Sequence, residues 1–364
     1  MTTLTQASQQ WYSRPADERY TSLLDMQAVM HRRRDMSRQD VQTTRKLTVM
    51  PAAEPAARDL AILIEDGHMA GEKLSPTHMS FGQLCSLAST PSPASYFRES
   101  NLPAAYISDC LNWNLRSRSI EDIGLLGQLG DSPELRAATG PNYGRVWDAE
   151  VVDALVRDFG DGVSGDWRIP GEFGKRLDQV TKANTTLFAS DRDMFVFLAD
   201  EDRRIEVAGR NLARGFFVWN SEVGDKTLGL GFFLFDYVCC NRIVWGADQY
   251  TEVRVRHTRG APDRWLEEVV PVLTEYSNGS AKPVMEAIER ARDKKVGEDL
   301  DKLLANRFGR SLVDPLKAVH VVEEGRPIES MWDMTVAATA HARSIQNNDK
   351  RLEIERAAGE LLAA

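Results

Sequence analysis

The sequence lacks any long apolar run, and this absence argues against a protein with a membrane-spanning helix. None of its apolar stretches approaches the roughly 20 residues that such a helix needs. The first ten residues are polar, whereas a secretory signal is basic and then apolar. We therefore expect a cytoplasmic protein with no membrane partner.

Cysteine is also scarce, because the 364 residues include four cysteines: Cys85, Cys110, Cys239 and Cys240. They are unevenly spaced within apolar segments, which is typical of buried, reduced thiols rather than of a disulfide framework. The adjacent Cys239 and Cys240 would point to opposite faces of a strand, so a bond between them would distort the backbone. The cysteines thus agree with a reducing compartment.

The common layouts of catalytic and cofactor-binding residues are missing as well. The six histidines lie far apart, and none stands at a metal-site interval from a cysteine or a carboxylate. No dinucleotide fingerprint follows a strand, and neither a nucleophile elbow nor a recognisable pair of carboxylates is present. The sequence indicates no catalytic residue, no metal and no cofactor, and it predicts a fold more clearly than a reaction.

The composition is that of an ordinary globular protein, with 42% apolar and 27% charged residues. The length exceeds the roughly 250–300 residues at which a single core stops growing, so we expect one large core and an appendage. The net charge of −9 argues against a surface that is basic throughout. Local basic patches can still bind nucleic acid within an acidic whole.

The residue patterns divide the chain into three regions. Residues 1–44 form an extension with one helix from about Ser22 to Asp35, residues 45–260 form an α+β core, and residues 261–364 form a helical region. The apolar spacing in the core predicts helices around residues 81–88, 104–115 and 148–159, the last capped by Asp148.

The predicted strands lie at residues 60–64, 185–189, 194–199, 216–220, 227–240 and 251–258. Those in the middle third are too close together for helical crossovers, and residues 222–226 have the character of a hairpin loop. We therefore predict an α+β fold with a central antiparallel sheet, packed helices and a helical C-terminal region.

The last predicted strand carries the sharpest functional pattern. Strand alternation sends Val255 inward and places Arg254 and Arg256 on the other face, about 7 Å apart. This spacing is close to the phosphate repeat of a nucleic-acid strand, and the nearby Trp245 could stack on a base. The alternative is that these are ordinary charged residues on the wet face of an antiparallel sheet.

A second basic cluster, Arg32, Arg33 and Arg34, closes the predicted N-terminal helix. Cations at a helix C-terminus complement the helix dipole, so capping is one interpretation of the run and a phosphate-binding patch is the other. Arg242 belongs to the same candidate set for nucleic-acid binding.

Polar residues also gather where the predicted strands end: Asn220, Ser221, Glu222 and Asn241. Such side chains can satisfy the backbone groups of turns. They could also converge with Arg242 on a ligand in a polar cleft, because buried asparagine marks either a structural network or a site.

Several segments along the chain together form a recognisable pattern: Trp11 to Pro15, Phe81 to Cys85, Leu135 to Tyr143, Gly215 to Gly224, Cys240 to Gly246, Arg256 to Thr258, Trp332 to Met334 and Glu355 to Gly359. This pattern resembles the phage/plasmid-like protein family, domain of unknown function 932. Family members often have a serine where residues 138–141 here read Ala-Thr-Gly-Pro. The resemblance implies a protein of phages, plasmids and integrative elements, with no established activity, catalytic residue or cofactor.

These observations favour a non-enzymatic accessory of DNA recombination or replication that contacts single-stranded DNA and can form a homo-oligomer. One alternative is a structural or protein-interaction component of a phage or plasmid system. The other is an enzyme with a polar cleft at the strand ends.

Overall fold

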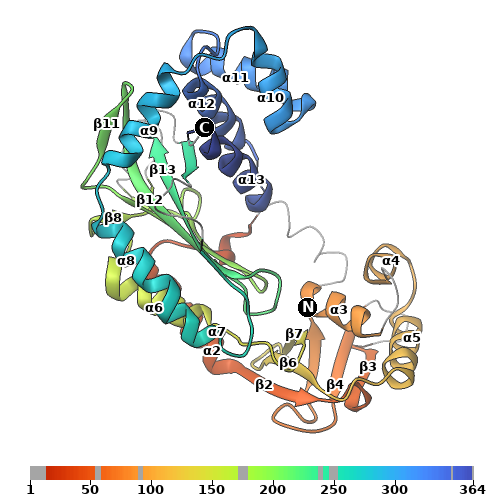
Figure 1. Ribbon diagram of the computed structural model, residues 1–364. Coiled ribbons are helices and arrows are strands. Elements are labelled where there is room, and N and C mark those ends of the chain that lie inside the picture. The colour runs from red at the N-terminus through yellow and green to blue at the C-terminus, as the bar shows by residue number, and fades with distance from the viewer. Residues whose placement is uncertain are drawn as a thin grey trace.

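The chain folds into two β-sheets with helices packed against them, as Figure 1 shows for the computed structural model. The structure describes residues 14–53, 59–88, 93–170, 179–236, 241–245, 253–345 and 347–362. The predicted α+β fold, with a large antiparallel sheet and a helical C-terminal region, is confirmed.

The larger sheet has the order β1-β9-β10-β12-β13-β14, and every strand pair in it is antiparallel. These strands are β1 (Arg19–Tyr20), β9 (Leu187–Ala189), β10 (Met194–Asp200), β12 (Arg210–Asn220), β13 (Leu228–Asp236) and β14 (Asn241–Trp245). The short strands β8 (Trp167–Arg168), β11 (Ile205–Val207) and β15 (Val253–Val255) pair with β10, β12 and β13. Residues 221–227 join β12 to β13, which confirms the predicted hairpin.

The central strands of this sheet are apolar along most of their length because both of their faces are covered. Every residue of β10 and β13 is buried. One face packs on α2 (Leu23–Met36), α6 (Asp148–Phe159), α7 (Ala261–Arg264) and α8 (Val270–Asn278). The opposite face is a layer of aromatic rings that contacts α13 (Asn348–Gly359) through Leu352.

Glycines alternate with aromatic residues across that second face. Trp219 lies opposite Gly229, and Phe217 lies opposite Gly231. A Cβ atom on Gly229 would sit 1.9 Å from the indole of Trp219, and one on Gly231 would sit 2.5 Å from the ring of Phe217. The glycines thus leave the space in which the rings lie flat on the neighbouring strand.

The smaller sheet has the order β2-β6-β7-β5-β4-β3. Its strands are β2 (Ser37–Gln42), β3 (Leu47–Pro51), β4 (Leu60–Ile64), β5 (Lys73–Pro76), β6 (Ile123–Gln128) and β7 (Glu134–Thr139). All pairs are antiparallel except β5 with β7. Helices α3 (His78–Leu87), α4 (Pro93–Glu99) and α5 (Ala104–Ser117) cover it and share its core.

The C-terminal region is helical, as the sequence predicts. After α8 it comprises α9 (Lys282–Asp293), α10 (Leu300–Phe308), α11 (Val313–Glu324), α12 (Met331–Ala342) and α13. Helix α12 ends at Ala342, and α13 begins after Asn347, whose side chain caps it. Pro271, which lacks an N–H, follows a π-helical turn, Trp265–Val269, that accommodates it.

Residues 19–42, predicted to belong to an N-terminal extension, are built into both sheets. Strand β1 pairs with β9 of the larger sheet, and β2 pairs with β6 of the smaller one. Between them α2 packs against α6. The predicted helix is therefore present, but it links the two sheets rather than standing outside the core.

Some predictions fall on residues that the structure does not describe. Cys239, Cys240, Thr251, Glu252 and the segment from Trp11 to Ser13 lie outside the described residues. Of the other cysteines, both free thiols, Cys85 is buried and Cys110 is half-buried. Within the described ranges, no helix has the length and apolar character that crossing a membrane requires.

Candidate nucleic-acid interface

Strand β15 lies at the edge of the larger sheet and alternates as the sequence predicts. Val255 is fully buried opposite Leu228, while Arg254, opposite Gly229, is exposed. Arg256, the next residue after the strand, is exposed too. The two guanidinium groups therefore extend from one short ribbon on its solvent side, about 7 Å apart along the backbone.

The segment after β15 is anchored tightly, which fixes the position of Arg256. The amide of Gly144 donates to the carbonyl of His257, and the His257 ring stacks on Tyr143 with centroids 4.9 Å apart. A Cβ atom on Gly144 would lie 1.8 Å from the carbonyl oxygen of Thr258, so only glycine fits there. Burial lowers the pKa of His257, so its ring is neutral at physiological pH.

The three arginines of α2 do not share one environment. Arg33 donates a hydrogen bond to the carbonyl of Ser190, and Arg34 pairs with Glu150 at 2.7 Å and lies over the ring of Trp147. Arg32 is exposed. Two of the three cations thus have internal partners, which favours the structural interpretation of this cluster over the phosphate-binding one.

The polar cleft predicted at the strand ends is not assembled, because strand register separates its members. Asn220 ends β12, whereas Asn241 lies opposite Asp236, which in turn lies opposite Leu212 near the start of β12. Eight residues of extended chain separate Leu212 from Asn220, a distance of roughly 27 Å. Arg242 and Trp245 follow Asn241 on β14, opposite Phe235 and Phe232, and so lie away from Glu222 as well.

Asn220, Ser221 and Glu222 are buried at the junction of the two sheets. The amide of Asn220 donates to the carbonyl of Val146 and to the carboxylate of Asp148. Ser221 donates to the carbonyl of Arg192 and accepts from the amide of Asp225. These bonds tie the β12–β13 hairpin to the start of α6, which is the turn-stabilising role.

Glu222 joins the two sheets through an ion pair. One carboxylate oxygen is 2.7 Å from a guanidinium nitrogen of Arg136 on β7, and the other accepts from the backbone amide of Asp148. Both side chains of the pair are at most 4% exposed. We call Arg136, Asp148, Asn220 and Glu222 the junction network.

The carboxylates of the junction network titrate differently. Burial, with the negative charge of Glu222, raises the pKa of Asp148 to about 7. Burial alone would also raise the pKa of Glu222, but the charge of Arg136 and the amide of Asp148 bring it below its ordinary value. Glu222 therefore keeps its charge, and Asp148 changes protonation near neutral pH.

The predicted helix cap at Asp148 is wrong in its detail. The N-cap position is Trp147, whose side chain makes no capping bond, and Asp148 is the first helical residue. Its carboxylate accepts from Asn220, and Glu222 binds its backbone amide in place of a local cap. A carboxylate does stabilise this helix N-terminus, but it comes from the β12–β13 hairpin rather than from a neighbouring residue of the chain.

Sequence reasoning missed the most exposed aromatic residue in the part of the chain that the structure describes. The indole of Trp113 on α5 is 76% exposed, and Tyr106, two turns earlier, is 57% exposed. The other tryptophans whose side chains the structure describes are half-buried or buried: Trp147, Trp167, Trp219, Trp265 and Trp332. Leaving most of an indole in water forgoes roughly 3 kcal/mol of burial free energy, so Trp113 contributes little to folding.

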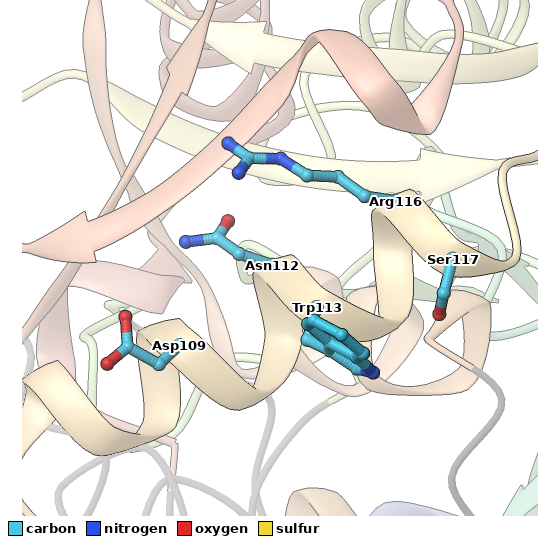
Figure 2. A pocket seen from close by; sticks show the side chains of 5 residues that line it. All are labelled: Asp109, Asn112, Trp113, Arg116 and Ser117. Atoms are coloured by element: carbon cyan, nitrogen blue, oxygen red, sulfur yellow. The ribbon is translucent and has the colours of Figure 1, made fainter.

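Trp113 lies in an open depression of about 620 Å³. The other described residues that line it are Asp109, Asn112, Arg116 and Ser117, and these too belong to α5. In Figure 2, Asp109, Asn112 and Arg116 extend from one side of the helix, and Trp113 and Ser117 extend from the neighbouring side.

The inner edge of this depression is held by Asn112. Its side-chain oxygen accepts from the amide of Val49 on the edge strand β3, and its nitrogen donates to the carbonyl of the same residue, both at 2.8 Å. Asn112 thereby pairs with the strand edge as another strand would, and α5 is fixed to the smaller sheet.

No group of three or more histidines, cysteines and carboxylates in the described part of the chain is placed to hold a metal ion. Comparison of the chain with protein-family models, with curated proteins and with solved structures finds no match. The resemblance to the phage/plasmid-like family therefore stays a prediction.

Proposed function

We propose that this protein binds single-stranded nucleic acid through β15, as an accessory of DNA recombination or replication. The observation that carries the proposal is the arrangement of Arg254 and Arg256 around the buried Val255. Two cations about 7 Å apart on a fixed ribbon match the phosphate repeat of an extended strand. The anchored segment after β15 holds this spacing before any ligand arrives.

Two considerations favour binding over catalysis. The polar residues that an enzyme would need are separated: Asn220, Ser221 and Glu222 are buried at the junction of the two sheets, whereas Asn241 and Arg242 lie on β14. At the junction of the two sheets, Asn220, Ser221 and Glu222 each bond to neighbouring backbone or side chains. A nucleic-acid strand requires no such centre, because cations on a surface are enough for it to bind.

Salt-dependent binding of a fluorescein-labelled, single-stranded 30-mer tests the proposal. We expect affinity to fall steeply as salt rises from 50 to 200 mM. In the double variant Arg254→Ala, Arg256→Ala, two phosphate contacts are lost, so the slope of log K against log salt should become shallower by about 1.4.

The matched control is the double variant Lys302→Ala, Arg310→Ala, which removes two exposed cations from the C-terminal helices. It changes the net charge by the same amount and should leave the slope unchanged. If both double variants make the slope shallower by the same amount, the effect is one of net charge, and the role of β15 is refuted. Absence of binding by the wild-type protein at 50 mM salt would refute the proposed function and favour a structural or protein-interaction role.

A further inference from the structure

The outer face of α5 consists of its exposed residues: Tyr106, Asp109, Trp113, Arg116 and Ser117. It lies opposite the apolar stripe of Ala104, Ile107, Leu111 and Leu115, which packs on the smaller sheet. The stripe and the contact of Asn112 with Val49 attach the helix firmly, so the outer face is not required for its position.

We infer that the outer face of α5 is a base-stacking site for single-stranded nucleic acid. The inference rests on the proposed function and adds to it a second contact, one that recognises the base rather than the phosphate. The ligand unit is one nucleotide within a strand, with its base against the indole of Trp113 and its phosphate at Arg116.

The first argument is the chemistry of the lining. An exposed indole stacks on any nucleobase, since every base has a π face. Arg116 lies three residues beyond Trp113, about 4.5 Å along the helix axis, and makes no ion pair with a described residue. Its guanidinium is therefore available for a phosphate or for the edge of the stacked base.

The second argument is the charge order along the helix. Asp109 lies one turn before Trp113, whereas Arg116 lies almost one turn after it. A carboxylate accepts hydrogen bonds from the exocyclic amino group of a base but repels a phosphate. The face therefore matches a nucleotide in one orientation, with the base toward Asp109 and the phosphate toward Arg116.

The third argument concerns the form of the ligand. The depression has the volume of a small-molecule pocket, but all of the described residues that line it come from a single helix and it lies open to solvent. A free nucleotide would bury little surface there. A strand that other contacts already hold on the protein can bind here despite the small buried surface, because its bases reach the indole at a high effective concentration.

The inference is tested by comparing the binding of strands with and without bases. The probes are a single-stranded 30-mer of deoxycytidine, an abasic 30-mer with the same phosphates, and cytidine monophosphate. The proteins are the wild type, Trp113→Ala, Trp113→Phe and the control Val322→Ala, which truncates an 83% exposed apolar residue on α11. Fluorescence anisotropy reports affinity, and quenching of tryptophan emission reports stacking.

We expect Trp113→Ala to bind the deoxycytidine strand between about 5-fold and 100-fold more weakly, the range for loss of one base–aromatic stack. Trp113→Phe should recover part of the loss, and Val322→Ala should bind like the wild type. The abasic strand should bind equally to the wild type and to Trp113→Ala. Cytidine monophosphate should bind far more weakly than the strand.

Three outcomes would overturn the inference. If Trp113→Ala binds the deoxycytidine strand like the wild type while Arg254→Ala, Arg256→Ala does not, the proposed function stands and the stacking site fails. If cytidine monophosphate binds as tightly as the strand, the site belongs to a free nucleotide. If no strand binds and Trp113→Ala alone abolishes self-association in sedimentation, the face is a contact between copies of the chain.

Discussion

The junction network and the outer face of α5 use similar side chains in opposite ways. In the junction network, arginine, carboxylate and asparagine bond to one another and to backbone, and Glu222 is 4% exposed. On the outer face of α5, Asp109 and Arg116 lie in solvent beside an indole that is 76% exposed. Buried polar groups that bond to one another thus hold the fold together, whereas charged groups that lie in solvent beside an exposed ring are accessible to a ligand.

The largest expected effect tests whether the junction network holds the two sheets together. Glu222→Gln removes the ion-pair partner of the buried guanidinium of Arg136, so we expect a loss of about 3–5 kcal/mol in the free energy of unfolding. Urea denaturation followed by circular dichroism measures it.

The matched control for this prediction removes both charges. The double variant Arg136→Met, Glu222→Gln should be more stable than Glu222→Gln alone, because no unpaired charge stays buried. A loss below about 1 kcal/mol in the single variant would contradict a structural role for the pair, and the junction would return as a candidate ligand site.

The second prediction concerns Asp148 and pH. Its pKa is about 7 in the folded protein, above the ordinary 3.8 that the unfolded chain would have. Between these values the folded state binds more protons than the unfolded state, so this residue's contribution to stability falls as pH rises from about 4 to about 7. Asp148→Asn removes the charge and retains an oxygen that can accept from Asn220.

We therefore expect Asp148→Asn to be more stable than the wild type, by on the order of 2–4 kcal/mol at pH 8. The advantage should grow from pH 4 to pH 7 and then stay constant, which urea denaturation across this range measures. A variant whose advantage does not change with pH would show that Asp148 ionises in the folded protein as it does in the unfolded chain.

Much of the larger sheet could be predicted from the sequence, but most of the smaller one could not. The strands of the larger sheet are long apolar runs bounded by Asp, Gly and Asn, and their hairpin has a clear turn. Strands β6 and β7 instead contain Gly124, Gly127, Ala137 and Ala138, which carry little strand signal. The pairing of β6 with β2 depends on tertiary contacts that a local pattern does not encode.

The candidate sites also differ in how far they could be predicted from the sequence. Alternation along one strand is enough to place Val255 inward and Arg254 outward, and the structure agrees. The distance between Asn220 and Asn241 depends on strand register, which the sequence does not give. Trp113, by contrast, could have been found, because it lies opposite the apolar stripe already recognised in its helix.

A smaller loss of stability is expected when the inner side of α5 is altered at Asn112. Asn112→Ala removes two hydrogen bonds to the edge strand at Val49, so we expect a loss of about 1–2 kcal/mol in the free energy of unfolding. Differential scanning calorimetry should show a lower Tm. An unchanged Tm would mean that the apolar stripe alone fixes the helix.

The smallest expected effect is the most informative for the comparison. Trp113→Ala should change the free energy of unfolding by less than about 0.5 kcal/mol, since the indole is 76% exposed and makes no ring contact with a described residue. The measurement is the same urea denaturation used for Glu222→Gln. A loss above about 1 kcal/mol would show that Trp113 packs within the fold, and the contrast with the junction network would then disappear. If Trp113→Ala leaves the stability unchanged but weakens binding of the deoxycytidine strand, the exposed indole contributes to recognition of the strand and not to folding.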